Sequence, residues 1–324
     1  MKAVRYHEYG GPEVLRWEDA PEPSPGAGDV LIKVEAAGVN FADLMRRSGK
    51  YHFHTDFPAR LGTEAAGTVV RVGRDVAGFR AGDRVFCRTA VAGCQAEVVT
   101  APAAEVLPLP AELSFVEAAA IPVIFLTAYH MLRTLAPVRP GETILIHAAA
   151  SGVGTAAVQL AKAWGARVVA TASTEEKLAL ARTLGADECI NYETEDFVKA
   201  ALGCTGGVGV DRVLECVGGD VLVRSVSALA PGGRLIIYGR ASGRLPALAP
   251  DEFFAKNLQL IGLNIGGKPW TQAVHRAALE DCLTMIAAGQ ARPVISTVLP
   301  LAQVTRAHQY LADRRTMGKV VLTP

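Results

Sequence analysis

The sequence predicts an α/β protein that combines a β-rich part with a doubly wound parallel sheet. Short strands separated by turns occupy residues 1–121, and strands alternate with helices over residues 122–262. Amphipathic helices and a terminal strand follow in residues 263–324. A chain of 324 residues is long enough for about two domains, and half of its residues are hydrophobic.

The first part contains β-runs such as Asp29–Val39, Gly67–Gly73 and Gly82–Cys87, separated by turn segments. Short strands at this spacing are typical of a small barrel or sandwich. In the last part we expect helices over Thr271–Ala288 and Leu301–Asp313, followed by a strand in "KVVLTP".

The middle part begins with the apolar strand Thr143–Ala148, followed by a small-residue helix that ends at Gly165. After the next strand, Ala166–Ala172, Ser173 and Glu176 predict a capping box that opens the following helix. Near-continuous apolar strands that alternate with helices indicate a parallel sheet covered on both faces. Further strands are expected at Glu188–Tyr192, Asp211–Gly218 and Gly233–Gly239.

The composition argues against several classes of protein. The 33 Lys and Arg residues balance 32 Asp and Glu residues without a long run of one sign, so a nucleic-acid partner is not expected. The longest apolar run, Ala118–Tyr129, is shorter than the ~20 residues of a membrane span. The chain start lacks the apolar core of a signal peptide, and the six cysteines include no close pair. We expect a soluble cytoplasmic protein with reduced thiols.

The segment "HAAASGVG" (His147–Gly154) lies where a parallel-sheet protein would bind the pyrophosphate of a dinucleotide. Aligned with G-x-G-x-x-G, its three glycine positions hold Ala149, Ser151 and Gly154. Ser151 either narrows the approach of the backbone or adds a hydroxyl ligand for phosphate. The residues predicted to form this cofactor turn are Ala149, Ser151, Gly152, Val153 and Gly154.

The end of the second strand predicts which dinucleotide binds. NAD-binding folds commonly place Asp or Glu there against the ribose 2′-hydroxyl, whereas this chain has Ser173, with Lys177 one helical turn later. A hydroxyl and an ammonium group would bind a 2′-phosphate, which favours NADPH. The alternative roles are a helix cap for Ser173 and a solvated helix face for Lys177.

With these segments in place, the sequence resembles the quinone oxidoreductases, the zeta-crystallin-like branch of the medium-chain dehydrogenase/reductase superfamily. The resemblance is carried by "GETILIHAAASGVGTAAVQLAK", "AAGVNFADLMRRSGKY", "LGTEAAGTVVRVG", "AAAIPVIFLTAYHML", "ALAPGGRLIIYG" and "DRRTMGKVVL", and it covers essentially the whole chain. It implies a discontinuous GroES-like catalytic domain (1–121 and 263–324) and a Rossmann NADP(H)-binding domain (122–262). It also implies a homodimer formed through the Rossmann sheets, with "LQLIGLNIGG" as the candidate strand.

The resemblance also implies the site residues. It places Asn40, Asp43, Tyr51 and Thr127 around the nicotinamide and substrate, although Asp43 can equally be structural and pair with Arg46 or Arg47. It places Tyr238, Gly239 and Arg240 near the nicotinamide and its ribose. It places Lys177, Tyr192 and Arg314 near the 2′-phosphate.

The resemblance further predicts that the protein holds no zinc. Zinc alcohol dehydrogenases of this superfamily carry a Cys and a His where this chain has Asn40 and Thr63, and neither Asn nor Thr is a good zinc ligand. The lobe for structural zinc is reduced to "CRTAVAGC". His52 and His54 form an HxH pattern, for which a loop at the cleft mouth is the simpler interpretation than a metal site. His147 is interpreted as a packed residue at a strand end.

Without a Lewis acid, polarisation of a substrate carbonyl must come from hydrogen bonds. The expected reaction is therefore NADPH-dependent hydride transfer to a small quinone or α,β-unsaturated carbonyl. An enoyl-thioester (enoyl-CoA or acyl-carrier-protein) reductase is the alternative enzyme. A NADPH-binding protein with a structural or RNA-binding role is the alternative outside catalysis.

Overall fold

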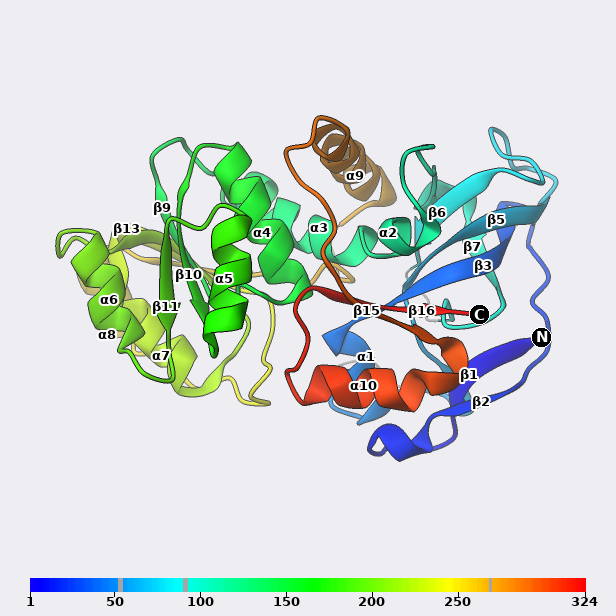
Figure 1. Ribbon diagram of the computed structural model, residues 1–324, viewed down its shortest axis with the longest axis horizontal. Helices are drawn as coiled ribbons and strands as arrows, with labels where there is room; N and C mark the ends of the chain where they lie inside the picture. The colour runs from blue at the N-terminus through cyan, green and yellow to red at the C-terminus, as the bar shows by residue number, and fades with distance from the viewer. Residues whose placement is uncertain (52–54, 90–92, 268–269) are drawn as a thin grey trace. The chain divides into compact units, whose positions relative to one another are not determined.

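The computed structural model describes residues 1–51, 55–89, 93–267 and 270–324 of the chain. The chain folds into two compact units, each made of more than one segment (Figure 1). Unit 1 comprises Met1–Val123, Thr271–Ala277 and Pro293–Pro324, and unit 2 comprises Ile124–Trp270 and Ala278–Arg292.

Unit 1 is built on two β-sheets. The smaller has the strand order β2-β1-β4, and the larger has the order β15-β16-β3-β5-β6-β8, with β7 paired to β3. Alternate side chains of the long strand β3, such as Val30, Ile32 and Val34, enter one apolar core. The strands are β1 (Lys2–Tyr6), β2 (Arg16–Asp19), β3 (Asp29–Val39), β4 (Ala59–Arg60), β5 (Glu64–Val72), β6 (Arg84–Arg88), β7 (Val98–Pro102), β8 (Val106–Pro108), β15 (Ile295–Pro300) and β16 (Lys319–Thr323).

Short helices complete unit 1. They are the 3-10 turns η1 (Pro12–Val14), η2 (Ala103–Glu105) and η4 (Leu301–Gln303), and the α-helices α1 (Phe41–Arg47), α2 (Phe115–Ala119) and α10 (Val304–Ala312). Helix α3 (Pro122–Tyr129) runs from unit 1 into unit 2 and continues as a π-helical segment, η3 (His130–Leu135).

Unit 2 contains a six-stranded sheet in which all neighbouring strands are parallel, with the order β11-β10-β9-β12-β13-β14. Counted from β9, this is 3-2-1-4-5-6, the strand order of a Rossmann fold. Helices α4 and α5 lie on one side of the sheet, and α6, α7 and α8 on the other (Figure 1). The strands are β9 (Thr143–Ile146), β10 (Arg167–Ala172), β11 (Glu188–Asn191), β12 (Val210–Glu215), β13 (Leu229–Ile237) and β14 (Gln259–Gly262). The helices are α4 (Gly152–Ala163), α5 (Glu175–Thr183), α6 (Phe197–Cys204), α7 (Gly219–Ser227), α8 (Pro250–Lys256) and α9 (Gln272–Ala287), the last beginning in unit 1.

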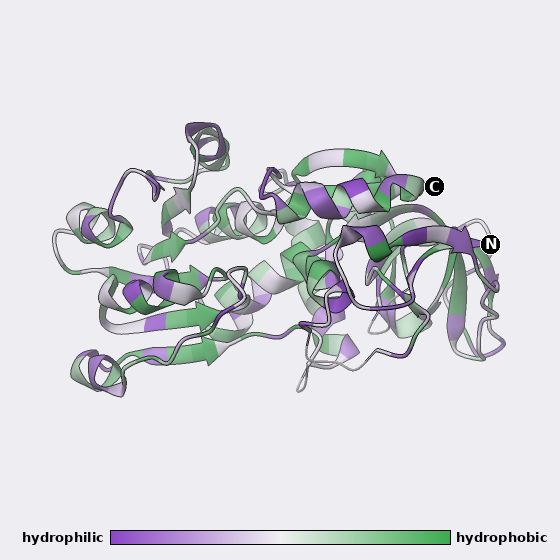
Figure 2. Cartoon of the chain, turned by 90° about the horizontal axis from the view of Figure 1, so that it is seen from below, coloured by the Kyte–Doolittle hydropathy of each residue, from purple (hydrophilic) through white to green (hydrophobic). Residues whose placement is uncertain are grey.

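The central strands of this sheet are apolar on both faces, because helices cover both. In β9 the consecutive residues Ile144, Leu145 and Ile146, which point to alternate faces, are all fully buried, and Figure 2 colours the chain by hydropathy. The strand order reverses between β9 and β12, and in open α/β sheets ligands bind outside the carboxyl ends of the strands at such a reversal. This edge of unit 2 is therefore where a ligand site is expected.

His147 follows β9 and is packed inside unit 2, as the sequence suggested. Its Nδ1 lies 3.0 Å from Thr171 Oγ1 and its Nε2 lies 2.9 Å from Ser225 Oγ, while the edge of its ring meets Phe197. Burial lowers the pKa of His147 to about 3. The folded protein therefore keeps this imidazole neutral at pH values where an unfolded chain protonates it.

We expect His147 to reduce stability as the pH falls. The unfolded chain binds a proton below about pH 6.5, whereas the folded state does so only near pH 3, so the free energy of unfolding decreases between these values. The contribution of this residue is about 2 kcal/mol between pH 7 and pH 5. His147→Gln should be less stable than the wild type at pH 7, yet lose about 2 kcal/mol less between pH 7 and pH 5 in urea unfolding. Equal pH dependence in the two proteins would contradict this assignment.

Candidate functional site

The turn between β9 and α4 is held by backbone hydrogen bonds. The Ala149 N–H donates to Thr171 O of β10 (3.0 Å), and the Ser151 N–H donates to Ala148 O (2.8 Å). Ala148 has a φ of +51°, in the left-handed region that non-glycine residues rarely adopt. The turn is thus compact without glycine at its first two fingerprint positions.

Gly154 is the fingerprint position that must remain glycine. A Cβ atom at this residue would lie 2.3 Å from Ala148 O and 2.7 Å from the Ala149 carbonyl carbon. The missing side chain lets the first turn of α4 pack directly on the backbone that leaves β9.

Ser151 is the N-cap of α4. Its hydroxyl oxygen accepts a hydrogen bond from the Gly154 N–H at 3.0 Å, which satisfies one of the donors that a helix leaves open at its start. The hydroxyl proton is still able to point to an acceptor outside the helix. Ser151 therefore has a capping role, which is neither of the two alternatives that the sequence offered, namely steric narrowing and phosphate binding.

The cap of the next helix differs from the prediction. Thr174, not Ser173, is the N-cap of α5, and its side chain accepts from the Lys177 N–H. Adjacent Ser and Thr residues made the two caps hard to distinguish, because each precedes a suitable helix start. Ser173 is therefore not used as the cap, and its Oγ accepts a hydrogen bond from Lys177 Nζ at 3.4 Å.

Ser173 and Lys177 thus lie together at the carboxyl end of β10, as the sequence predicted for residues that recognise a 2′-phosphate. Tyr192 follows β11 at the same edge, where its N–H donates to Ala172 O at 3.2 Å and its side chain is exposed. Arg314, the fourth residue of the predicted phosphate group, belongs to unit 1 and has a φ of +56°.

Tyr238, Gly239 and Arg240 follow β13 at the same edge of the sheet. The Tyr238 N–H donates to Glu215 O at 2.9 Å, and a Cβ atom at Gly239 would lie 3.1 Å from Cys216 O. Burial, reinforced by the nearby Cys216, raises the pKa of the Tyr238 phenol well above its usual range, so it remains a donor.

Glu215, at the end of β12, was not singled out in the sequence. Its Oε1 accepts from the N–H groups of Val217 (2.6 Å) and Gly218 (2.9 Å). Burial raises the pKa of this carboxyl group. Its Oε2 is buried and has no hydrogen-bond partner among the described residues. The signal that could have identified Glu215 is its position at the carboxyl end of the predicted strand Asp211–Gly218.

In unit 1, Asn40 precedes α1 and is almost buried, with 9% of its surface exposed. Its Nδ2 donates to Glu64 Oε1 at 2.7 Å, and its Oδ1 accepts from Lys319 Nζ. Lys319 also forms an ion pair with Glu64 Oε1, while Glu64 Oε2 accepts from the Val123 N–H at 2.7 Å. A carboxylate, an ammonium group and an amide therefore form one buried network, of which the sequence reasoning identified only Asn40.

Asp43 was expected to pair with Arg46 or Arg47 in a structural role, and the charge of Arg46 does lie close enough to favour its ionised carboxylate. Its carboxylate accepts from the N–H groups of Asn40 (2.9 Å) and Gly62 (3.2 Å) and from Gln95 Nε2 (3.4 Å). Burial raises the pKa of Asp43. Arg47, one of the two arginines expected to pair with it, instead donates to Gly10 O and lies against His308 Nδ1. Asp43 thus orders the backbone around Asn40.

The other two residues predicted for catalysis have different surroundings. The Tyr51 ring lies under the guanidinium group of Arg46, 5.0 Å from its Cζ. Thr127 is a buried residue of α3 and belongs to unit 2, whereas Asn40, Asp43 and Tyr51 belong to unit 1.

The prediction that the protein holds no metal involves two histidines that the structure does not describe. His52 and His54 lie outside the described residues. In the part of the chain that is described, no three His, Cys, Asp or Glu side chains are grouped as a metal site. The Cys94 thiol is buried beside Cys87. The contact with Cys87 and the burial both raise the pKa of Cys94 well above its usual range.

Within the described ranges, no helix has the length and hydropathy to cross a membrane.

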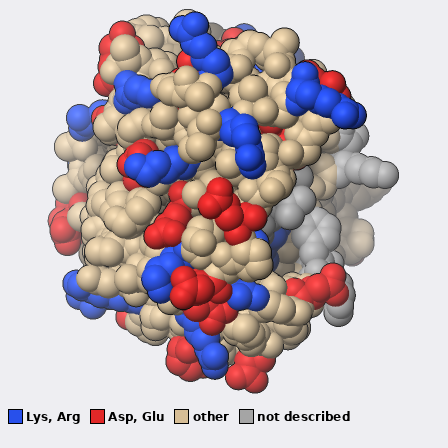
Figure 3. All heavy atoms as spheres, turned by 90° about the vertical axis from the view of Figure 1, so that its right-hand side faces the viewer, with Lys and Arg blue, Asp and Glu red and all other residues tan. Residues whose placement is uncertain are grey.

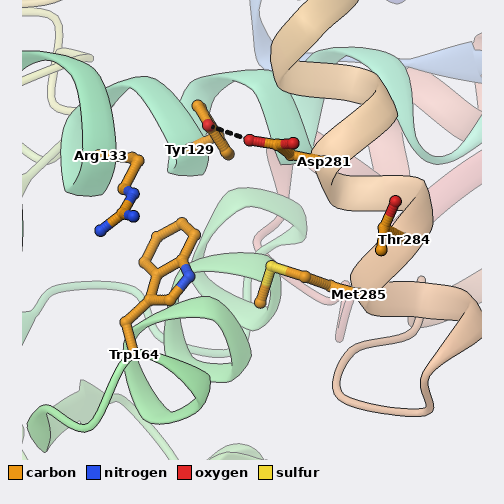
Figure 4. Close-up of a pocket in the computed structure, with 6 residues that line it drawn as sticks. All are labelled: Tyr129, Arg133, Trp164, Asp281, Thr284 and Met285. Atoms are coloured by element: carbon orange, nitrogen blue, oxygen red, sulfur yellow. Dashed lines mark hydrogen bonds between the residues drawn. The ribbon is translucent and has the colours of Figure 1, made fainter.

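A separate pocket of about 190 Å³ lies in unit 2 at the C-terminal end of α4 (Figure 4). Tyr129 Oη donates to Asp281 Oδ2 at 2.6 Å, and burial together with this carboxylate raises the pKa of Tyr129 to about 12. None of the residues predicted for cofactor or substrate lines it, so it is not the predicted site. Its lining residues are Tyr129, Arg133, Trp164, Asp281, Thr284 and Met285.

Comparison with known proteins identifies the family. A model described as the alcohol dehydrogenase GroES-like domain matches residues 26–111, and one described as zinc-binding dehydrogenase matches residues 152–279. A quinone oxidoreductase of Pseudomonas aeruginosa is 37% identical over 100% of this chain and 99% of its own length. A 2-haloacrylate reductase of a Burkholderia species is 35% identical over 100% of this chain and 99% of its own. 

Among solved structures, Escherichia coli quinone oxidoreductase complexed with NADPH superposes with a TM-score of 0.95, at 34% identity and 100% coverage of both chains. The expected combination of a GroES-like domain and a Rossmann domain is confirmed. The chain belongs to the quinone oxidoreductase family of the medium-chain dehydrogenase/reductase superfamily.

Proposed function

We propose that this quinone oxidoreductase-like enzyme is a NADPH-dependent, zinc-independent reductase that transfers hydride to a quinone or an α,β-unsaturated carbonyl. The observation that carries the proposal is the Ser173–Lys177 pair at the carboxyl end of β10. A hydroxyl group and an ammonium group at this position suit a 2′-phosphate, whereas a carboxylate would repel it. The NADPH complex of the Escherichia coli relative supports the same cofactor.

The turn after β9 fits the pyrophosphate of that cofactor. The space that a Cβ atom would fill at Gly154 is taken by the turn backbone, so the first N–H groups of α4 lie close to the sheet edge. We assign the pyrophosphate contacts to the backbone of Ala149, Ser151, Gly152 and Val153, beside Gly154. The Ser151 hydroxyl can donate to a phosphate oxygen while it accepts from Gly154.

Zinc independence is supported by the hydrogen bonds of the Asn40 side chain. Its amide oxygen, the atom that could ligate a metal, accepts from Lys319, and one N–H of its amide nitrogen donates to Glu64. Thr63 stands at the second expected ligand position, and neither residue type is a good zinc ligand.

Bound NADPH supplies the hydride, and the chain's own residues bind and orient the reactants. We assign Asn40 and Tyr51 to hydrogen bonding of the substrate oxygen, with Asp43 supporting Asn40 and Thr127 contacting the nicotinamide. We assign Tyr238, Gly239 and Arg240 to the nicotinamide ribose. Tyr192 and Arg314 join Lys177 in the 2′-phosphate group.

The candidate substrates are all acceptors with a conjugated carbonyl or carboxyl group. The 2-haloacrylate reductase relative supports a conjugated carboxylate as a further acceptor, and an enoyl thioester is the alternative of the same chemical class. An RNA-binding role has less support than catalysis, because Lys and Arg side chains are interspersed with Asp and Glu on the face in Figure 3. A NADPH-binding protein with a structural role is the other alternative outside catalysis. We also propose a cytoplasmic location, since all six cysteines are free thiols.

Lys177→Ala should weaken the binding of NADPH by about 1–3 kcal/mol, the range of charge-assisted hydrogen bonds, with little effect on NADH. The dissociation constants of both cofactors can be measured by fluorescence titration. Lys199→Ala removes an exposed positive charge from α6 and serves as the matched control. Equal losses for NADPH and NADH would contradict the assignment of Lys177.

Turnover of NADPH should be fastest with quinones or simple enones. The decrease of NADPH absorbance is followed with 9,10-phenanthrenequinone, 1,4-benzoquinone, 2-cyclohexen-1-one, 2-chloroacrylate and crotonyl-CoA. Dialysis against a chelator should leave the rates unchanged because no step requires zinc. A strong preference for crotonyl-CoA would favour the thioester alternative, and no turnover of any acceptor would favour a non-catalytic role.

We further propose a homodimer formed through β14. This strand pairs with β13 on one side and has no strand on its other side among the described residues, and Leu260 is 53% exposed. An open strand edge of this kind readily pairs with another chain.

Leu260→Lys should therefore shift the protein from dimer to monomer, because it places a charge on the proposed interface. Light scattering coupled to size exclusion measures the mass of each species. Val208→Lys changes another exposed apolar residue and should leave the dimer intact. A dimer in both variants would show that β14 is not the interface.

A further inference from the structure

The buried ion pair between Lys319 and Glu64 lies next to Asn40 because of the strand register in unit 1. Val320 of β16 is opposite Val39 of β3, which brings Lys319 beside the residue that follows β3. Lys319 and Glu64 are 2% and 0% exposed, so both charges are removed from water. Such a pair is costly to build and is therefore weak evidence for stability alone.

The space for the Glu64 carboxylate is created by a glycine. A Cβ atom at Gly38 would lie 2.4 Å from Glu64 Oε1 and 2.7 Å from the Ala119 carbonyl oxygen. The missing side chain therefore lets the carboxylate reach Lys319 and the Asn40 amide. The Asp43 carboxylate fixes the backbone of Asn40 by accepting a hydrogen bond from its N–H.

The contacts of Asn40 leave one donor unused. Its amide nitrogen carries two N–H groups, one of which donates to Glu64 Oε1, and no second partner of this nitrogen occurs in the described part of the chain. Its oxygen accepts from the Lys319 ammonium group. A cation bound to an amide oxygen draws electron density toward that oxygen and makes the N–H groups stronger donors.

We propose that Lys319 is a positioning residue of the reductase, which acts through Asn40 to stabilise negative charge on the substrate oxygen. This inference rests on the proposed function, in which Asn40 contacts the substrate. Hydride addition to the β-carbon of an enone leaves an enolate, and hydride transfer to a quinone leaves a hydroquinone monoanion. In both products the displaced π-electron pair lies on the substrate oxygen, which then takes a proton from water. The polarised N–H of Asn40 binds this oxygen as the charge develops. Glu64 balances the charge of Lys319 and fixes the rotation of the amide.

The test uses two acceptors whose oxygens differ in basicity. The enolate formed from 2-cyclohexen-1-one is more basic than the aromatic hydroquinone monoanion formed from 9,10-phenanthrenequinone, so it gains more from a strong hydrogen-bond donor. For Lys319→Met we expect kcat to fall about 100-fold with the enone and less than about tenfold with the quinone. The dissociation constant of NADPH should stay within about twofold, because the change removes only stabilisation that arises during hydride transfer.

Because Lys319→Met strands a buried carboxylate, the double variant Lys319→Met/Glu64→Gln removes both charges and should show the same selective loss. Lys319→Arg keeps the cation and should restore the ratio of enone to quinone rates. The control is Arg212→Met/Glu142→Gln, which removes the ion pair of a fully buried arginine in unit 2. It should leave that ratio unchanged.

Equal losses with both acceptors in the Lys319 variants would overturn the inference and assign the ion pair a purely structural role. A selective loss in the Arg212 control would also overturn it. The wild-type rates separate this failure from that of the proposed function. If the wild type reduces both acceptors and the ratio does not change in the variants, only the role of Lys319 is wrong. If the wild type reduces neither acceptor, both proposals fail.

Discussion

The close approach of helix α4 to strand β9 is the constraint on which the cofactor edge of unit 2 depends. Gly154 permits this approach, because any side chain there would collide with the carbonyl groups of Ala148 and Ala149. The hydrogen bond from Ala149 to Thr171 then ties the turn to β10, and β10 in turn carries Ser173 at its end. One missing side chain thus sets the distance between the start of α4 and the Ser173–Lys177 pair that we propose to recognise the 2′-phosphate.

Much of this arrangement could be predicted from the sequence, because burial on both faces produces the uninterrupted apolar strands of a parallel sheet. The parallel sheet follows from that pattern, and the pairing of Ser173 with Lys177 follows from helical spacing. The cap of α5 could not be predicted with certainty, since Ser173 and Thr174 are chemically equivalent candidates and only the backbone conformation distinguishes them. This disagreement matters, because it releases the Ser173 hydroxyl from a structural task.

The network around Asn40 could not be predicted for a different reason. Lys319 and Asn40 are 279 residues apart, and their contact depends on the register of β16 against β3. A single strand does not reveal its register with a distant partner, and a lysine at the start of "KVVL" is equally compatible with a solvated strand end. The partners of Asp43 were missed in the same way, since Gly62 and Gln95 reach it through chain segments that only the folded sheet brings together.

The Ser151 cap has a consequence for how the empty and loaded forms of the protein are related. Because its hydroxyl already accepts from the Gly154 amide, one donor in the first turn of α4 is satisfied before any ligand binds. A loop that is ordered in advance has little conformational entropy left to lose when a dinucleotide arrives. In the proposed dinucleotide site, serine at this position therefore preorganises the turn, and less of the binding free energy of the phosphates is spent on ordering it.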